Sequence, residues 1–331
     1  MLSANMKAAV LSSIGGPEGF KCLDDIPIPE LQEGTVIVKN KISSINYADV
    51  YFRTGIYPSA GNTDLILGQE AAGVIVAAPV DEPLGLKKGD RVVWIAQGAY
   101  AQYTRVPTSQ IIKIPQGVED EDAAGAFLAG MTALTLISEA FPAKAGDWAL
   151  VHAAAGGVGL LLCQALKDMG AVVIGTAGGP EKCQLALQNG ASHVIDYRAE
   201  KEWPKKVLEL TGGRGVDVAY DGVGKDTWEG TIQTIGLFGT AVFIGNASGA
   251  VPPIGLEKLT AKNISLIRPT LRNYISTRYR LERYGNKALE MVQQGKWKIL
   301  KHDRYYSLEE VEQAHRDLEN RATKGKLLIR L

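Results

Sequence analysis

The stretch from Trp148 to Leu166 constrains the fold of this chain more than any other. An apolar run, Trp148–Val151, precedes a turn of small residues, His152–Gly159, and a second apolar run with helical spacing follows. This pattern predicts a strand, a glycine turn and a helix, in which the backbone can approach a pyrophosphate and the helix N-terminus can bind it. The spacing is A-x-x-G-x-x-G and not G-x-G-x-x-G, so an ordinary glycine turn is an equally good interpretation of the motif alone.

The segments around this turn alternate between strands and helices. From about residue 129 to 267 we expect six strands, beginning near residues 148, 171, 193, 216, 240 and 264, with helices over 180–189 and 200–211. Alternation of this length implies right-handed crossovers and a parallel sheet. The sequence therefore predicts an α/β fold with a Rossmann-type doubly wound sheet of six strands, whose ligand binds at the carboxyl ends of the strands.

The flanking residues predict a second, β-rich domain. Residues 6 to about 128 contain short β-branched or aromatic runs separated by glycine turns, and an irregular polar and aromatic stretch over 45–58. Two helical segments and a terminal strand, Lys326–Arg330, follow the Rossmann-type part, and that strand needs a sheet to join. With 331 residues, two domains are expected: 1–128, 129–267, and 268–331 returning to the first domain.

Composition favours a small molecule as the partner. The 36 Lys and Arg residues balance the 36 Asp and Glu residues, which argues against a surface devoted to nucleic acid or acidic lipid. Cys22, Cys163 and Cys183 are too few and too widely spaced for a disulfide framework or a cysteine zinc site. No apolar run approaches the roughly 18 residues of a membrane span, and Met1–Asn5 shows no signal peptide. We therefore expect a cytoplasmic protein.

The residues after the second predicted strand indicate NADPH as the cofactor. In an NAD-selective fold an acidic residue about 20 positions past the first glycine binds the ribose hydroxyls. That position falls within Thr176–Gly179, which contains no carboxylate. Lys182, in the first turn of the next helix, and Tyr197–Arg198, after the third strand, could instead bind a 2′-phosphate. Lys182 alone could equally be a solvated surface residue.

Five stretches carry a resemblance to a known family: 46–58, 152–159, 220–224, 245–249 and 321–326. From Met6 onward the chain resembles the zinc-independent quinone oxidoreductases of the medium-chain dehydrogenase/reductase superfamily, which include zeta-crystallin. The resemblance implies a GroES-like domain, a Rossmann-type domain and an interdomain cleft that holds NADPH and a small quinone. It also implies a homodimer, or a pair of dimers, joined through the edges of the nucleotide-binding sheets.

Position by position, the resemblance also implies the cofactor contacts. The nicotinamide, ribose and pyrophosphate contacts fall on Asn46, Tyr51, Thr132, Gly156, Gly157, Val158 and Gly159. The 2′-phosphate contacts fall on Gly178, Lys182 and Tyr197, and further cofactor contacts on Gly222, Asn246, Arg268 and Arg321. One position departs from the family, because Ala129 stands where the relatives carry Lys or Gln, which removes a polar contact near the nicotinamide.

Zinc-dependent relatives bind their metal through a cysteine at the Asn46 position and a histidine in a G-H-E motif. This chain has Asn46 and Gly68-Gln69-Glu70 instead, so a three-ligand zinc site cannot be assembled. We therefore expect no metal, and no alcohol oxidation through a zinc-bound alkoxide.

Without a metal, the expected acceptor is already electrophilic, as a quinone is. Hydride transfer places negative charge on its oxygen, and Asn46, Tyr51 and Tyr57 are the candidate hydrogen-bond donors. The tyrosines could also be packing residues, an interpretation that we favour less because they belong to an irregular segment. Asp49 could relay a proton, but a structural hydrogen-bond acceptor is the preferred interpretation. His152 is interpreted as a satisfied core residue, and His193, His302 and His315 as surface residues.

Two other functions stay open. An NADPH-dependent enoyl or alkenal reductase on the same scaffold needs the same cofactor and the same electrophilic slot. RNA binding is suggested by residues 268–306, where ten Lys or Arg residues face three acids and are interleaved with six aromatic residues. We favour RNA binding less, since a solvated helical face also explains this pattern.

Overall fold

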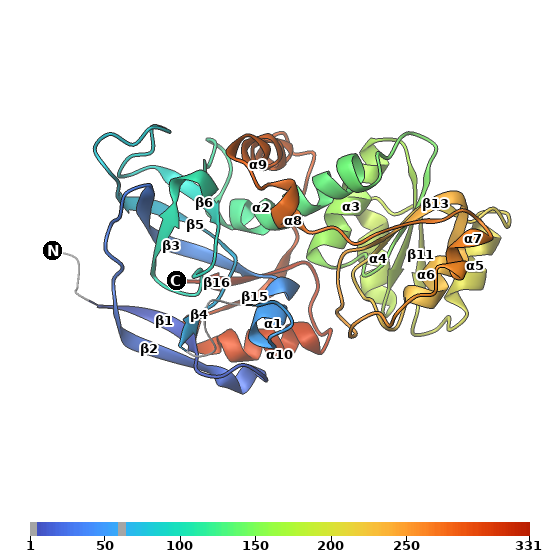
Figure 1. Cartoon of the computed structure of the whole chain (residues 1–331), viewed down its shortest axis with the longest axis horizontal. Helices are drawn as coiled ribbons and strands as arrows, with labels where there is room; N and C mark the ends of the chain where they lie inside the picture. Colours follow the sequence, from blue (N-terminus) through green and yellow to red (C-terminus); the bar gives the residue numbers. More distant parts are fainter. Residues whose placement is uncertain (1–4, 59–63) are drawn as a thin grey trace. The chain divides into compact units, whose positions relative to one another are not determined.

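The computed structural model describes residues 5–58 and 64–331, which form two compact units (Figure 1). The first unit comprises Met1–Leu128, Thr277–Gly295 and Ile299–Leu331, and the second comprises Ala129–Ser276 and Lys296–Lys298. Segment 268–276, which the sequence analysis placed in the return segment, belongs to the second unit. Residues 1–4, on which part of the signal-peptide expectation rested, lie outside the described residues.

A six-stranded parallel sheet forms the centre of the second unit. Its strand order is β11-β10-β9-β12-β13-β14, so the chain order reverses between β9 and β12, as in a dinucleotide-binding fold. The strands are β9 (Trp148–Val151), β10 (Val172–Ala177), β11 (His193–Asp196), β12 (Val216–Asp221), β13 (Ile235–Phe243) and β14 (Ser265–Ile267). The central strands are almost continuously apolar because both of their faces are buried. The predicted Rossmann-type sheet is confirmed.

Helices flank this sheet (Figure 1). They are α3 (Gly157–Asp168), α4 (Pro180–Gln188), α5 (Trp203–Leu210) and α6 (Trp228–Thr234), and the short α7 (Glu257–Thr260) and α8 (Leu271–Tyr274) follow along the chain. Leu150, Ile174 and Ala219 from the sheet pack with Val207 of α5 and Ile232 of α6 in one buried cluster.

The first unit contains two sheets. The larger runs β15-β16-β3-β5-β6-β8, with β7 also paired to β3, and the smaller runs β2-β1-β4. The strands are β1 (Asn5–Leu11), β2 (Phe20–Pro27), β3 (Thr35–Ile45), β4 (Leu65–Ile66), β5 (Glu70–Ala77), β6 (Arg91–Ile95), β7 (Tyr103–Pro107), β8 (Ile111–Lys113), β15 (Lys301–Tyr306) and β16 (Lys326–Arg330). The predicted last strand, β16, lies antiparallel to β3, with Leu328 opposite Ser44.

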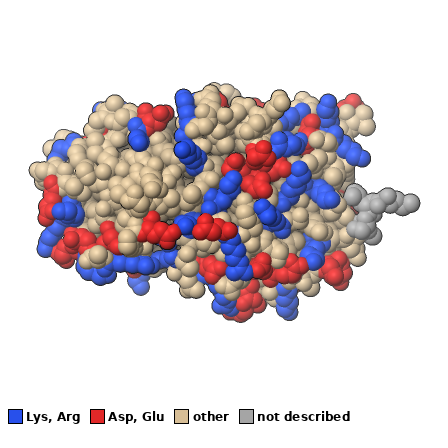
Figure 2. Space-filling model, turned by 180° about the vertical axis from the view of Figure 1, so that it is seen from behind, with Lys and Arg blue, Asp and Glu red and all other residues tan. Residues whose placement is uncertain are grey.

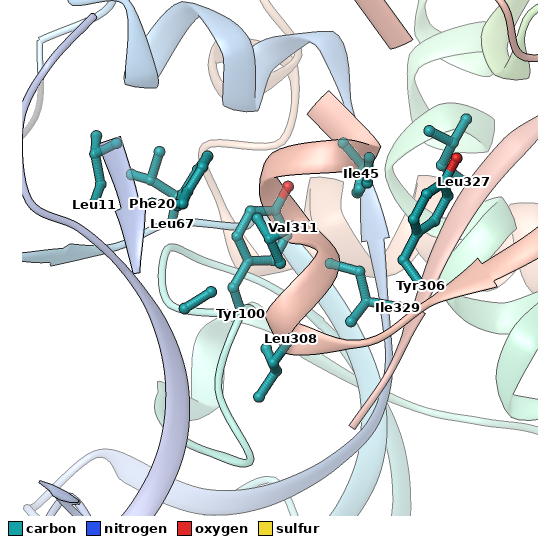
Figure 3. Close-up of a cluster of buried hydrophobic side chains, with 12 residues drawn as sticks. Leu11, Phe20, Ile45, Leu67, Tyr100, Tyr306, Leu308, Val311, Leu327 and Ile329 are labelled. Carbon is teal, nitrogen blue, oxygen red and sulfur yellow. The ribbon is translucent and has the colours of Figure 1, made fainter. Parts of the chain in front are cut away.

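The helices of the first unit include three longer ones and three single turns. They are α1 (Tyr47–Arg53), α9 (Arg278–Gln293), α10 (Val311–Glu319) and the 3-10 turns Pro17–Gly19, Thr108–Gln110 and Leu308–Glu310. Figure 3 shows a core in which Val311 of α10 and Ile329 of β16 lie near Tyr100, while Leu327 of β16 lies beside Tyr306. Residues from both ends of the sequence therefore build the same core.

Helix α2 (Asp120–Thr135) continues into a π-helical turn, Leu136–Ala140. Among the described residues, Asp120–Ala140 is the one helix that is long and apolar enough, by length and composition, to cross a membrane. No run of this kind was expected from the sequence. Because 67% of its apolar window is buried inside the protein, packing in the core accounts for its composition.

Candidate active site

The stretch over 45–58 contains helix α1, so its interpretation as irregular is wrong. The carboxylate of Asp49 accepts a hydrogen bond from the backbone N–H of Asn46 at 2.8 Å, which stabilises the first helical turn. An N-x-x-D spacing at 46–49 was the sequence signal for this helix start. The helix brings Asn46, Asp49 and Tyr51, three of the predicted catalytic residues, into one local structure.

Aromatic rings cover one side of α1. Tyr51 lies between Tyr47 and Tyr57, with ring centroids 5.4 Å and 5.1 Å away. Tyr51 is only 4% exposed, while Tyr57 is half-buried and lies beyond the helix. From the sequence, a packing role was favoured less for both tyrosines because their segment looked irregular. That reason does not hold for Tyr51, which lies on α1 and is buried. Tyr57 is the more accessible hydroxyl of the two.

A buried ion pair holds the side chain of Asn46. Lys326 Nζ lies 3.0 Å from Glu70 Oε1 and donates to Asn46 Oδ1 at 2.7 Å. Asn46 Nδ2 donates to the same Glu70 oxygen at 2.9 Å. The Lys326 and Glu70 side chains are 5% and 0% exposed. Glu70 also accepts from the Ser44 hydroxyl and, through Oε2, from the backbone N–H of Leu128.

Glu70 and Lys326 were not among the predicted site residues. From the sequence, Glu70 was named only as the third residue of Gly68-Gln69-Glu70, and Lys326 only as the last residue of the stretch 321–326 and the first residue of a strand. A signal was present, because a lysine that ends a family stretch and begins an apolar strand is buried there only if it has a partner. The partner itself, 256 positions away, could not be identified without the fold.

The residues where zinc-dependent relatives hold their metal do not fit a zinc ion. The Asn46 amide oxygen and a Glu70 oxygen both lie within 3.0 Å of a lysine ammonium, which would repel a metal cation there. Within 5–58 and 64–331, no group of three or more His, Cys, Asp or Glu residues could hold a metal ion.

A second buried polar group lies behind α1. Tyr100 donates its hydroxyl proton to Asp49 Oδ2 at 3.0 Å, and His315 Nε2 lies 3.3 Å from the same hydroxyl. All three side chains are fully buried. Burial raises the pKa of Asp49 to about 7, against hydrogen bonds from Asn46 and Tyr100 that lower it. Burial, together with the charge of Arg53, lowers the pKa of His315 to about 3.

The interpretation of His315 as a surface residue is wrong. It lies on α10 beside Val311, Ala314 and Leu318, residues that pack on the core at helical spacing. That spacing was visible in the sequence. His152 is buried as expected, with Nδ1 2.9 Å from the Thr176 hydroxyl and Nε2 3.1 Å from the Thr231 hydroxyl.

In the second unit, the glycine turn has the close packing that a phosphate cradle requires. Gly156 is the N-cap of α3, and Ala153 has a left-handed φ of 51°. A Cβ at Gly159 would lie 2.3 Å from the carbonyl oxygen of Ala153, so only glycine fits there. The turn therefore brings bare backbone to the N-terminus of a 12-residue helix, which suits a pyrophosphate.

A line of hydrogen bonds joins the carboxyl ends of three neighbouring strands. Thr231 donates its hydroxyl proton to Asp221 Oδ2 at 2.8 Å, so it accepts from His152 Nε2. His152 Nδ1 then accepts from Thr176. Asp221 also accepts from the backbone N–H groups of Val223 and Gly224, which fixes the turn that contains the predicted contact Gly222.

Cationic and hydroxyl groups converge on Gly178, at the carboxyl end of β10. A Cβ at Gly178 would lie 2.6 Å from the Tyr197 hydroxyl and 3.0 Å from Arg198 Nε. Lys182 is in the first turn of α4, two residues after its N-terminal proline. The nearby carboxylate of Asp196 accepts from the backbone N–H groups of Gly179 and Arg198. The structure thus places Tyr197 and Arg198, two residues that the sequence suggested for a 2′-phosphate, next to Gly178.

The remaining predicted contacts are distributed over both units. Gly222 O accepts from Ala247 N at 3.2 Å, which brings Gly222 next to the loop that contains Asn246. Arg268 follows β14 and donates to the carbonyl oxygen of Phe243 at 2.8 Å. Thr132 is half-buried on α2, and the departing residue Ala129 is fully buried. Arg321 belongs to the first unit and has a left-handed φ of 56°.

Two protein-family models match this chain. Residues 32–116 match the alcohol dehydrogenase GroES-like domain, and residues 157–289 match the family described as zinc-binding dehydrogenase. The first match lies in the first unit, and the second covers most of the parallel sheet and its helices.

Individual proteins match over nearly the full length. The chain is 41% identical over 315 residues to the "Probable quinone oxidoreductase" of Schizosaccharomyces pombe, which covers 95% of this chain and 94% of that protein. It is 33% identical over 334 residues to the 2-haloacrylate reductase of a Burkholderia species, covering 97% and 98%. The crystal structure of Escherichia coli quinone oxidoreductase complexed with NADPH superposes with a TM-score of 0.92, at 36% identity, covering 98% of this chain and 100% of that one.

Proposed function

The chain belongs to the quinone oxidoreductase family of the medium-chain dehydrogenase/reductase superfamily, and we propose that it reduces small quinones with NADPH. The observation that carries the proposal is the Lys326 ammonium beside Asn46 and Glu70. With a fixed cation at this position, no metal is required, and the substrate must be electrophilic on its own. The enzyme is therefore proposed to be zinc-independent.

The second unit has the groups that NADPH requires, and bound NADPH supplies the hydride. The glycine turn Gly156–Gly159 and the N-terminus of α3 would hold the pyrophosphate. Tyr197, Lys182 and Arg198 would hold the 2′-phosphate beside Gly178, since cations and a hydroxyl recognise that dianion. The other proposed cofactor contacts are Asn46, Tyr51, Thr132, Gly222, Asn246, Arg268 and Arg321.

The first unit has the groups that an acceptor oxygen requires. Reduction of a quinone takes up a hydride and one proton from solvent, and negative charge appears on the oxygen before that proton arrives. The side-chain N–H of Asn46 and the Tyr57 hydroxyl are donors that would stabilise this charge. Tyr51 packs against Tyr57 with an interplanar angle of 67°, so it would orient that ring more than bind substrate.

The experiment follows NADPH oxidation by its near-ultraviolet absorbance with 9,10-phenanthrenequinone, 1,4-benzoquinone and a linear enone. Each acceptor is tested with and without EDTA, and with NADH in parallel. The expected result is rapid reduction of the quinones, at a higher rate with NADPH than with NADH and at the same rate with and without EDTA. If only the enone is reduced, the quinone reductase proposal is wrong and the protein is an enoyl or alkenal reductase, for which the relative named 2-haloacrylate reductase is a precedent.

We propose that the protein is a homodimer joined through β14, the edge strand of the second unit. Leu237, Phe238 and Leu256 are 63%, 69% and 78% exposed, and Leu266 of β14 is also exposed. Phe238 has a left-handed φ of 62°, which is strained for an aromatic residue. An unpaired strand edge beside exposed apolar side chains supports pairing with a second copy.

The six aromatic side chains on which the RNA hypothesis depends are divided. Tyr284, Trp297 and Tyr306 are buried and could not stack on bases, whereas Tyr279 is 72% exposed and the other two are half-buried. On the face in Figure 2, Lys and Arg side chains mix with Asp and Glu side chains. A solvated face remains the preferred interpretation. Cytoplasmic location remains a proposal, and the free thiols of Cys22, Cys163 and Cys183 support it.

A further inference from the structure

We propose that Lys326 is a positioning residue, which fixes the side-chain amide of Asn46 so that its N–H, and not its carbonyl, faces the oxygen of the acceptor. The inference rests on the proposed quinone reductase function and deepens it. It assigns a role to a lysine that lies on β16, 280 positions from Asn46 in the sequence.

The two neighbours of the amide allow only one orientation. The Lys326 ammonium has donors and no acceptor, so the amide atom 2.7 Å away must be the oxygen. The Glu70 carboxylate accepts, so the amide atom 2.9 Å from it must be the nitrogen. A flipped amide would place N–H against an ammonium and oxygen against a carboxylate.

This orientation leaves one hydrogen of Asn46 Nδ2 for the substrate. The first hydrogen points to Glu70 Oε1. Among the described residues, the second hydrogen has the Ser44 hydroxyl oxygen as its partner at 3.4 Å, a long and therefore weak hydrogen bond. This N–H can exchange that bond for a stronger one to the oxygen that gains negative charge when a quinone is reduced.

The ion pair also strengthens this donor. A positive charge 2.7 Å from the amide oxygen draws electron density from the nitrogen and makes its N–H a better donor. Glu70 is held by the Ser44 hydroxyl, Asn46 Nδ2, Lys326 Nζ and the Leu128 N–H, so the carboxylate cannot rotate away. Such a satisfied buried network gives a fixed geometry as well as stability.

The test compares four variants by steady-state kinetics with NADPH and 9,10-phenanthrenequinone, and by thermal unfolding. Lys326→Met keeps the length of the side chain and removes its charge, and Lys326→Met with Glu70→Gln also removes the unpaired carboxylate. Asn46→Asp keeps an oxygen toward Lys326 and removes the N–H. Lys113→Met, which removes a lysine that pairs with Asp90 at the surface, is the matched control.

We expect kcat to fall by about 10- to 100-fold in Lys326→Met and by about 100-fold in Asn46→Asp, as for loss of one donor to a developing oxyanion, with a smaller change in KM. The double variant should regain thermal stability without regaining kcat, and Lys113→Met should keep the wild-type kcat. A double variant that regains both would reduce Lys326 to a charge-balancing role. A wild-type kcat in Lys326→Met would exclude any positioning role.

A second readout separates this inference from the proposed function. In protein labelled with ¹⁵N-asparagine, the Asn46 side-chain amide should exchange slowly with solvent in the wild type and rapidly in Lys326→Met. If the wild type reduces no acceptor, the proposed function is wrong, but the exchange rates still test whether Lys326 holds the Asn46 amide in place. Equal exchange in both proteins would overturn the inference.

Discussion

The hydroxyl of Tyr100 donates to Asp49 Oδ2 at 3.0 Å, in a part of the first unit where both side chains are fully buried. Asp49 also accepts from the backbone N–H of Asn46, so one carboxyl group connects the start of α1 to the core. Protonation of Asp49 should therefore make a measurable contribution to the free energy of unfolding of the protein.

The stability of Asp49→Asn, compared with that of the wild type at the same pH, should increase as the pH rises. The pKa of the folded Asp49 is raised from 3.8 to about 7, so between these values the folded protein holds a proton that the unfolded chain has released. Its contribution to stability therefore falls as the pH rises through this range. The free energy of unfolding of Asp49→Asn minus that of the wild type should increase by about 1.4 kcal/mol per pH unit between about pH 4.5 and 6.5.

The measurement is urea unfolding at several pH values, with Asp81→Asn, a change at an exposed turn, as the control. His315 titrates in the opposite sense, because its pKa is lowered to about 3 and its contribution falls as the pH drops below about 6.5. In the wild type, the contributions of Asp49 and His315 to the pH dependence of the free energy of unfolding have opposite signs and offset one another. In Asp49→Asn only the contribution of His315 remains. A difference between Asp49→Asn and the wild type that is independent of pH would contradict this account.

Arg198→Ala should weaken NADPH binding and leave NADH binding unchanged. The Arg198 guanidinium lies beside Gly178, where the 2′-phosphate is proposed to bind. Loss of a charge-assisted contact should raise the Kd for NADPH by about 10- to 100-fold. Fluorescence titration measures both cofactors, and Lys206→Ala, an exposed lysine of the same unit, serves as the control. Equal losses for NADPH and NADH would place the phosphate elsewhere.

Gly159→Ala and Gly222→Ala should fail in different ways. At Gly159 a Cβ would lie 2.3 Å from a backbone oxygen, so this variant should lower the melting temperature of the protein and abolish NADPH binding. At Gly222 the nearest atom to a Cβ would be Ile244 Cγ1 at 3.6 Å, an ordinary contact. Gly222→Ala should therefore fold normally and bind NADPH more weakly. Calorimetry with and without NADPH distinguishes the two; a normal melting temperature for Gly159→Ala would refute the packing argument.

Leu237→Asp should convert the protein to monomers. Leu237 is 63% exposed next to the strained Phe238, and a carboxylate there would be buried without a partner in the proposed interface. Analytical ultracentrifugation measures the change, with Val80→Asp, fully exposed in the first unit, as the control. A wild type that sediments as a monomer would rule out the proposed dimer.

The second unit could be predicted well from sequence because its signals are local. Each strand is a short apolar run, each crossover is a helix, and the turn after β9 has a recognisable spacing. The convergence of Tyr197 and Arg198 on Gly178 also followed from strand order, since neighbouring parallel strands end at the same edge.

The first unit was harder because its contacts join distant residues. The α1 helix and the buried face of α10 had local signals, a capping pattern and a helical spacing, that were interpreted as an irregular stretch and a surface histidine. The Glu70–Lys326 pair had no local signal for its partner. The last strand was expected to join a sheet of the first unit, but its neighbour β3, and the side chains that this pairing brings together, depended on a register that the sequence does not specify.

The pairing of β3 with β16 also orders the events of biosynthesis. The second unit is encoded between the segments of the first, so during translation its sheet can form while β3, already able to pair with β5 and β7, still lacks β16 as a neighbour. Asn46 acquires its hydrogen bond from Lys326 only after residue 326 has left the ribosome. Until then Glu70 has no buried cation beside it, and the nascent chain can fold a nucleotide-binding unit before it can assemble the acceptor site.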